Sequence, residues 1–168
     1  KKYKLYAYFC SVMLIFYMVI ENVLNSPEHP WVFYTAYPLI WWPITASIGK
    51  KAKTLKYAWI VTTITIFYYA TLNLVLSPIH PWVIYPTYLI LWWPITIHYV
   101  KKKNYFGLSV VGSIISILFF SLVNVTTSPN TLWAIYPIFV ILWWPLTMYY
   151  FSFLKRKQES EKRKKATK

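Results

Sequence analysis

The chain has 168 residues, of which 58% are hydrophobic, 21% aromatic and only 13% charged. A soluble domain carries about 25% charged residues, so this composition excludes an ordinary water-soluble globule and indicates a chain surrounded by lipid. A net charge of +14 would suggest a nucleic acid partner in a soluble protein, but here the basic residues form clusters that flank apolar runs. Membrane topology accounts for such clusters, so we expect anionic lipid headgroups beside them and no nucleic acid.

Six apolar runs follow one another along the chain, each near the length of about 20 residues that a helix needs to cross a bilayer. The runs are continuous and do not alternate with a period of two, which excludes transmembrane β-strands. They come in pairs, with a short turn around Ser-Pro inside each pair. The runs cover residues 5–24, 31–48, 57–76, 82–100, 105–125 and 132–154. We therefore predict an all-α integral membrane protein with six transmembrane helices arranged as three helical hairpins.

The three hairpins repeat one sequence at intervals of 51 residues. The second copy reads "SPIHPWVIYPTYLILWWPIT" from Ser77 to Thr96, and the other two copies keep its Ser-Pro, its Trp and its Trp-Trp-Pro. A period this regular indicates tandem duplication of one structural unit. The predicted organisation is hairpin repeat 1 at residues 1–50, repeat 2 at 51–103, repeat 3 at 104–154 and a basic cytoplasmic tail at 155–168. The tail is expected to extend the last helix briefly and then to fray.

The Lys and Arg residues predict the orientation of the helices. The N-terminus with Lys1, both loops between repeats and the tail are basic, whereas the three Ser-Pro turns contain no Lys or Arg. The positive-inside rule then places both termini in the cytoplasm and the turns outside. Because each repeat has an even number of spans, the repeats are parallel about an axis along the membrane normal. The three units could close as a pseudo-threefold bundle, stack in a row or assemble across subunits.

Each repeat has an asparagine about one turn below the outer end of its first helix. An amide in hydrocarbon is costly unless it is bonded, so we expect it to bond the turn backbone or a neighbouring helix. Three equivalent amides, together with Glu21, could instead form a polar ring or a pathway at one depth. The Ser-Pro that follows is typical of a helix start, with Ser as the cap. The three asparagines are Asn22, Asn73 and Asn124.

The Trp-Trp-Pro of each repeat lies deep in the second helix. Its proline removes a hydrogen bond from the carbonyl four residues earlier, at Leu39, Ile90 and Ile141, and should bend the helix. The tryptophans could fill the space that the bend opens, or line a cavity for a lipid tail, a hydrophobic peptide or an organic cation. We predict that the Trp pairs and one tyrosine of each repeat bind a ligand or partner: Trp41, Trp42, Trp92, Trp93, Trp143, Trp144, Tyr34, Tyr85 and Tyr136.

Candidates for catalysis or metal binding are few. The chain has no Asp, and Glu21 and Glu28 are its only acidic residues outside the tail. Cys10 is the single cysteine, so neither an intrachain disulfide nor a cysteine zinc site can form. His29 and His80 share a position in the turns, but no carboxylate or cysteine framework accompanies them. We expect no enzyme activity, no cofactor and no metal.

The pattern Asn-(x)3-Ser-Pro-(x)3-Trp-(x)9-Trp-Trp-Pro resembles the small bacterial two-transmembrane-helix (2TM) domains, which also pair a first-helix Asn with a Trp-containing second helix. The resemblance covers residues 6–48, 57–99 and 108–150. The Gly-rich stretch and the following His of that family's second helix are replaced here by "WPIT", with His98 nearby. The resemblance implies a bacterial membrane protein and transfers no site residues.

We therefore predict a non-enzymatic, multi-pass protein of the bacterial cytoplasmic membrane. It would bind a partner membrane protein or a lipophilic ligand within the bilayer, in an accessory, sensing or protective role. One alternative is a small transporter or channel with a pathway along the repeat axis. Another is a membrane-held regulator that acts through its basic tail.

Overall fold

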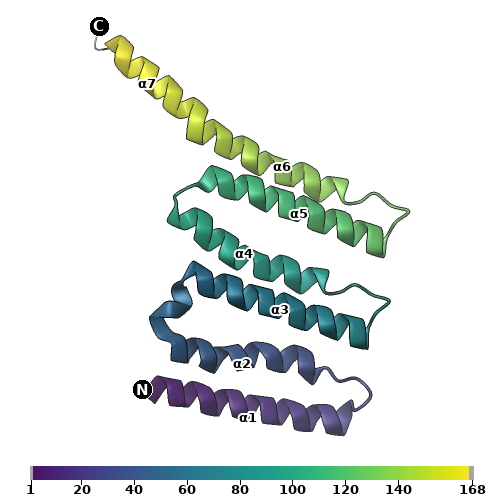
Figure 1. Ribbon diagram of the computed structural model, residues 1–168. Coiled ribbons are helices and arrows are strands. Elements are labelled where there is room, and N and C mark those ends of the chain that lie inside the picture. Colours follow the sequence, from purple (N-terminus) through teal and green to yellow (C-terminus); the bar gives the residue numbers. More distant parts are fainter. Residues whose placement is uncertain (1, 167–168) are drawn as a thin grey trace. The chain divides into compact units, whose positions relative to one another are not determined.

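The computed structural model describes residues 2–166 and is helical throughout this range, apart from short turns and loops (Figure 1). The predicted all-α fold is therefore confirmed. Lys1 of the basic N-terminus, and Thr167 and Lys168 of the tail, lie outside the described residues. The helical elements are α1 (Lys2–Asn25), α2 (Val32–Ile48), the 3-10 helix η1 (Gly49–Lys53), α3 (Leu55–Leu76), α4 (Ile84–Lys101), α5 (Tyr105–Thr127), α6 (Ile135–Tyr149), the π-helix η2 (Tyr150–Leu154) and α7 (Lys155–Ala166).

Four helical stretches are long and apolar enough to cross a membrane. They are Lys2–Asn25, Leu55–Leu76, Tyr105–Thr127 and Ile135–Ala166. The other two predicted spans form the shorter helices α2, with 17 residues, and α4, with 18 residues. Four such helices are typical of a membrane protein.

The chain forms two compact units, Lys1–Ala58 and Trp59–Lys168, and the division between them falls inside α3. In the first unit, α1 packs along α2. In the second unit, α5 lies between α4 and α6 and packs against both (Figure 1).

Small residues on α5 explain its close packing on two neighbours. Ser109, Gly112, Ser113 and Ser116 are all buried, and their short side chains let neighbouring helices approach. Several bulkier residues of α5 lie toward the surroundings, among them Ile114, which is half exposed. This division of small and large residues is the usual pattern for a helix packed among others in lipid.

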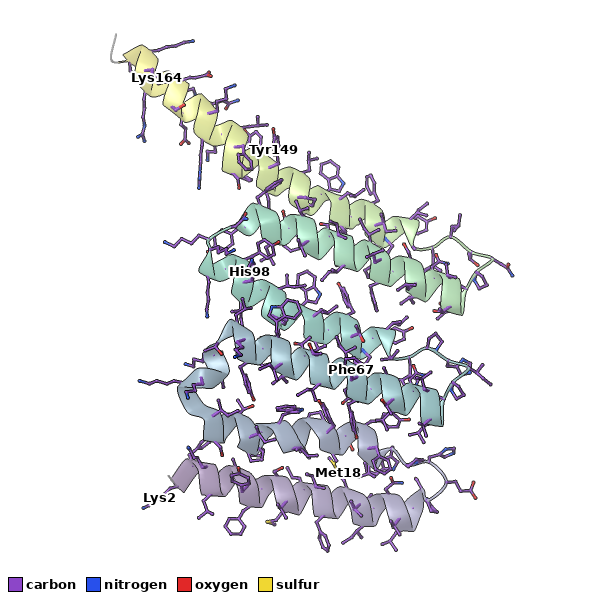
Figure 2. The ribbon with its side chains drawn as sticks, in the orientation of Figure 1. Lys2, Met18, Phe67, His98, Tyr149 and Lys164 are labelled. Atoms are coloured by element: carbon purple, nitrogen blue, oxygen red, sulfur yellow. The ribbon has the colours of Figure 1, made fainter. Side chains whose placement is uncertain are left out.

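The basic tail is helical for longer than expected. The π-helix η2 follows α6 directly, and α7 continues to Ala166, with exposed side chains that radiate from the helix, Lys164 among them (Figure 2). The expectation of early fraying was wrong because Lys, Arg, Gln and Glu are good helix formers. Glu159 and Arg163 are also four residues apart, a spacing at which opposite charges support a helix.

Candidate functional site

The turn of the first hairpin is built around the side chain of Asn22. Its Nδ2 donates hydrogen bonds to the carbonyl oxygens of Ser26 at 2.7 Å and His29 at 2.9 Å. Its Oδ1 accepts from the backbone N–H of Val32 at 3.1 Å, the first residue of α2. The amide is buried, so these three bonds supply the partners that it would otherwise need from water.

The same three bonds recur in the other two turns. Asn73 and Asn124 each donate to two turn carbonyls and each accept from the backbone N–H near the start of the next helix, Val83 at 2.9 Å and Ala134 at 2.8 Å. Both amides are buried. In all three hairpins, the asparagine therefore bonds the backbone of its own turn, one of the two arrangements expected for an amide at this depth.

The Ser-Pro dipeptides do not start the second helices. The residues before α2, α4 and α6 are Trp31, Val83 and Ala134, and none of them forms a side-chain cap. Instead the turn continues for several residues after Ser-Pro, and the asparagine of the preceding helix bonds the backbone N–H where the next helix begins. The expected serine cap was wrong: the asparagine amide donates two hydrogen bonds to the turn and accepts a third from the start of the next helix, whereas a hydroxyl can donate only one.

In the first hairpin, a serine hydroxyl bonds the backbone carbonyl whose helical donor is missing because of a proline. Ser11 on α1 is buried, and its Oγ donates to the carbonyl oxygen of Leu39 at 2.6 Å. Leu39 precedes Pro43 by four residues, so no backbone N–H of the usual helical partner reaches that oxygen. The bond therefore supports α2 at its proline and ties it to α1.

The other repeats have hydroxyls at the equivalent positions, Thr62 and Ser113, each 51 residues further on. Thr62 is 1% exposed and Ser113 4% exposed. Neither hydroxyl oxygen has a hydrogen-bond partner. A buried hydroxyl without a partner is costly, so these two positions need a physical explanation.

The two predicted tryptophans of the first unit each contact a tyrosine. Trp41 and Trp42 are both half-buried, and Trp41 makes an edge contact with the ring of Tyr37 at 6.2 Å between centroids. The indole Nε1 of Trp42 donates to the hydroxyl of Tyr3 at 3.3 Å. The partly exposed Tyr34 lies on the same helix.

Two predicted tryptophans from different repeats meet at α5. The rings of Trp92 on α4 and Trp144 on α6 lie 6.1 Å apart. A Cβ added to Gly112 would lie 2.6 Å from Trp92 and 2.7 Å from Trp144. The glycine therefore makes room for both indoles.

The remaining predicted aromatic residues differ in how far their side chains are exposed. Trp93 is half-buried, whereas Tyr85, Tyr136 and Trp143 are exposed, Tyr136 at 72% and Trp143 at 56%.

Glu21, proposed for a polar ring, accepts a hydrogen bond from Asn25 at 2.6 Å on its own helix. Within the described residues, no group of three His, Cys, Asp or Glu side chains is placed to hold a metal ion.

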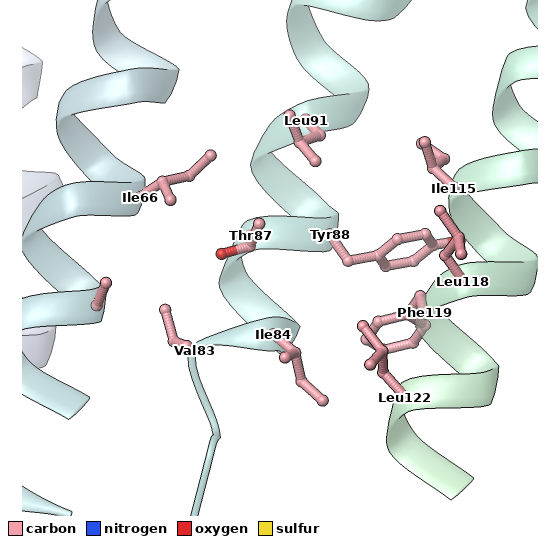
Figure 3. A pocket seen from close by; sticks show the side chains of 11 residues that line it. Ile66, Val83, Ile84, Thr87, Tyr88, Leu91, Ile115, Leu118, Phe119 and Leu122 are labelled. Carbon is pink, nitrogen blue, oxygen red and sulfur yellow. The ribbon is translucent and has the colours of Figure 1, made fainter. Parts of the chain in front are cut away.

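An apolar groove of about 370 Å³ lies between α3, α4 and α5 in the second unit (Figure 3). Ile66 on α3, Leu91 on α4 and Leu118 on α5 are among its walls. Thr87 is the one lining residue with an aliphatic hydroxyl. The full lining comprises Ile66, Ala70, Val83, Ile84, Thr87, Tyr88, Leu91, Ile115, Leu118, Phe119 and Leu122.

Tyr88 and Phe119 form a stacked aromatic pair in the groove wall. Their rings stack with centroids 4.1 Å apart and planes 9° from parallel. The Tyr88 hydroxyl lies 2.8 Å from the Ser116 hydroxyl, so its polar end is paired with α5. The groove therefore presents ring faces and branched aliphatic groups to an occupant.

Sequence reasoning did not find this groove, because it depends on which faces of three helices meet. The hydroxyls at positions 11, 62 and 113 could have been found in the sequence, since they share the 51-residue period with the prolines.

No family model, curated protein or solved structure matches this chain.

Proposed function

We propose that this protein is a six-span, non-enzymatic protein of the bacterial cytoplasmic membrane, built from three tandem hairpins with both termini in the cytoplasm. Its function is to hold the hydrocarbon chain of a membrane lipid in the groove between α3, α4 and α5. The observation that carries this proposal is the groove itself, which is open, apolar and formed by helices suited to a bilayer.

The proposal includes α2 and α4 as membrane spans. At about 1.5 Å per residue, helices of 17 and 18 residues extend about 26 Å, close to the bilayer hydrocarbon thickness of about 30 Å. Trp31 and Trp82 lie at the outer end of these helices, where an indole ring suits the headgroup region. Lys50 and Lys101 lie at the opposite ends, and a lysine there can extend its amine toward the headgroups.

The chemistry of the groove favours a hydrocarbon occupant. Its walls are almost wholly apolar, and the Tyr88 hydroxyl is already paired with Ser116. Within lipid, binding depends on dispersion and shape, because burial from water supplies no gain there. The volume lies in the range of about 300–1,000 Å³ that is typical of ligand sites.

Cysteine accessibility tests the number of spans. In a Cys10→Ala protein, a cysteine replacing Pro78 is expected to react with a membrane-impermeant maleimide added to intact cells, whereas one replacing Lys51 is expected to react only after lysis. Six spans place these residues outside and inside respectively. If only the four longer helices crossed, both results would be reversed.

Filling the groove tests lipid binding. We expect a phosphatidylglycerol that carries a diazirine in one acyl chain to label the Tyr88–Leu91 region saturably in nanodiscs. Ala70→Trp should weaken this labelling about tenfold, or about 1.4 kcal/mol, because the indole occupies the groove. The matched control is Phe67→Trp on the same helix, where the side chain is 72% exposed and outside the groove.

Competition with unlabelled lipids identifies which lipid supplies the hydrocarbon chain in the groove. Unlabelled phosphatidylglycerol should remove the labelling, and a long isoprenoid alcohol that removed it at a much lower mole fraction would identify an isoprenoid as the ligand instead. Labelling that rose linearly with probe and was insensitive to Ala70→Trp would show that the groove holds only bulk lipid.

A further inference from the structure

The contact between the second and third hairpins is formed by α4 and α5. The ring of Tyr88 on α4 stacks on Phe119 of α5, and its hydroxyl lies 2.8 Å from the Ser116 hydroxyl. Further along the same face of α4, Trp92 packs against α5 at Gly112. These contacts show how the second helix of one hairpin holds the first helix of the next.

The corresponding face of α6 is exposed. The residues 51 positions after Tyr88 and Trp92 are Phe139, which is 64% exposed, and Trp143. The residues through which α4 lines the groove have their counterparts in a hollow along α6, namely Ile135, Ile138, Phe139 and Leu142. The outer face of α6, defined by Phe139 and Trp143, is therefore the surface that α4 turns toward α5, here without a covering helix.

The complementary surface is exposed on α1. Two repeat intervals before Phe119, the equivalent residue of α1 is Tyr17, and the equivalent of Ser116 is Leu14. Both α1 side chains are exposed, Tyr17 at 62%. The outer face of α1, defined by Leu14 and Tyr17, thus corresponds to the surface with which α5 meets α4.

A coordinated difference between the two pairs of faces supports their complementarity. Between α4 and α5, the hydroxyl of Tyr88 is matched by the hydroxyl of Ser116. On α6 and α1 both hydroxyls are absent together, since Phe139 stands in place of the tyrosine and Leu14 in place of the serine. A contact that lost only one of them would leave a hydroxyl without its partner, which is costly in an apolar setting. Rings are kept at both stacking positions, Phe139 and Tyr17.

We propose that the outer face of α6 in one copy of this protein binds the outer face of α1 in a second copy, as α4 binds α5 within the chain. The inference rests on the proposed topology, in which α1 and α6 cross the membrane in opposite directions. Two copies inserted alike then meet with these helices antiparallel, the arrangement of α4 and α5 (Figure 1). Because the two copies use different faces, the contact is heterologous and can continue into a ring or a row of copies.

Disulfide formation between two differently tagged copies tests the contact in membranes. In a Cys10→Ala protein, one copy carries Phe139→Cys and the other carries Tyr17→Cys, and co-expressed membranes are oxidised with copper phenanthroline. We expect a disulfide-linked dimer that contains both tags. Neither variant expressed alone should form it, because the contact needs one face of each kind.

Two controls use exposed positions beside the expected contact, Val12→Cys on α1 and Val140→Cys on α6. Their counterparts in the second unit, Ile114 and Leu89, stay exposed although α4 and α5 pack together. Each control cysteine, paired with the original cysteine on the other helix, should give no dimer above the level of either variant alone.

Phe139→Ala tests the ring without any cysteine. Energy transfer between fluorescent proteins fused after the tail reports self-association in vesicles of phosphatidylcholine and phosphatidylglycerol. Loss of the ring should raise the half-saturating protein density about fivefold, the factor for one aromatic pair of ordinary strength. Val140→Ala should leave this density unchanged.

The other occupants of these faces predict different results. A dimer from Phe139→Cys alone or Tyr17→Cys alone, at the level of the mixture, would show a symmetric contact. A disulfide that forms only within one chain carrying both cysteines would show that α1 and α6 of the same copy meet. No mixed dimer, or an unchanged density with Phe139→Ala, would show that lipid covers both faces. Each of these results would overturn the proposal, whereas failure of the lipid labelling would not, because the contact does not involve the groove.

Discussion

Asn22→Leu is expected to lower the free energy of unfolding of the first hairpin by about 2–4 kcal/mol. The substitution leaves the carbonyls of Ser26 and His29 and the N–H of Val32 without the partner that now serves all three. Leucine has a similar size, so the loss reports hydrogen bonding more than packing. The measurement is urea unfolding in detergent micelles, followed by circular dichroism.

Asn25 provides a control in the same helix. It is exposed and makes one bond, to Glu21, so Asn25→Leu should change the unfolding free energy by less than about 0.5 kcal/mol. Asn22→Asp keeps the oxygen that accepts from Val32 but loses both donated bonds, and should be destabilising as well. Equal stability of the Asn22→Leu and Asn25→Leu proteins would show that the amide does not hold the turn.

Gly112→Val is expected to separate α5 from its neighbours and to cost about 3 kcal/mol of unfolding free energy. Even a Cβ at this position lies 2.6 Å from Trp92 and 2.7 Å from Trp144, well inside contact distance. Both indoles would have to move, and the ring contact between them would be lost. Unfolding in the same micelles, followed by tryptophan fluorescence, measures the effect.

A second substitution separates crowding from other effects of valine at Gly112. Trp92→Leu shortens one of the two obstructing side chains, so it should recover part of the stability lost in Gly112→Val. Ile114→Phe adds volume on the half-exposed side of α5 and should change stability by less than about 0.5 kcal/mol. Additive losses in the Gly112→Val and Trp92→Leu pair would contradict the steric account.

The helical architecture was predictable because its causes are local. Continuous apolar runs near 20 residues predict helices, and the turn residues between them predict where the chain reverses. The buried asparagine was predictable for the same reason, since an amide at that depth must find partners close by. The choice of partner was not predictable: the sequence favoured serine as the cap, but Asn22 reaches from α1 to the start of α2.

The binding residues were harder to foresee, because equivalent positions of a repeat do not have equivalent neighbours. The repeat predicts one role for Trp92 and Trp143, the first tryptophans of their pairs. In the second unit, Trp92 packs against Gly112, whereas Trp143 is exposed on α6. Whether the Trp pairs bind a ligand or partner stays a prediction.

The sequence by itself determines a composition typical of a membrane protein, and it predicts helices. It also shows a period of 51 residues and the prolines that deprive carbonyls of their helical donors. These properties depend on residue type and on spacing along one chain. The tertiary structure alone decided that α3, α4 and α5 enclose a groove, and that one hydroxyl of the repeat is bonded while two are not. The physical reason is that packing depends on which helix faces meet, and similar hairpins at different places in the chain meet different neighbours.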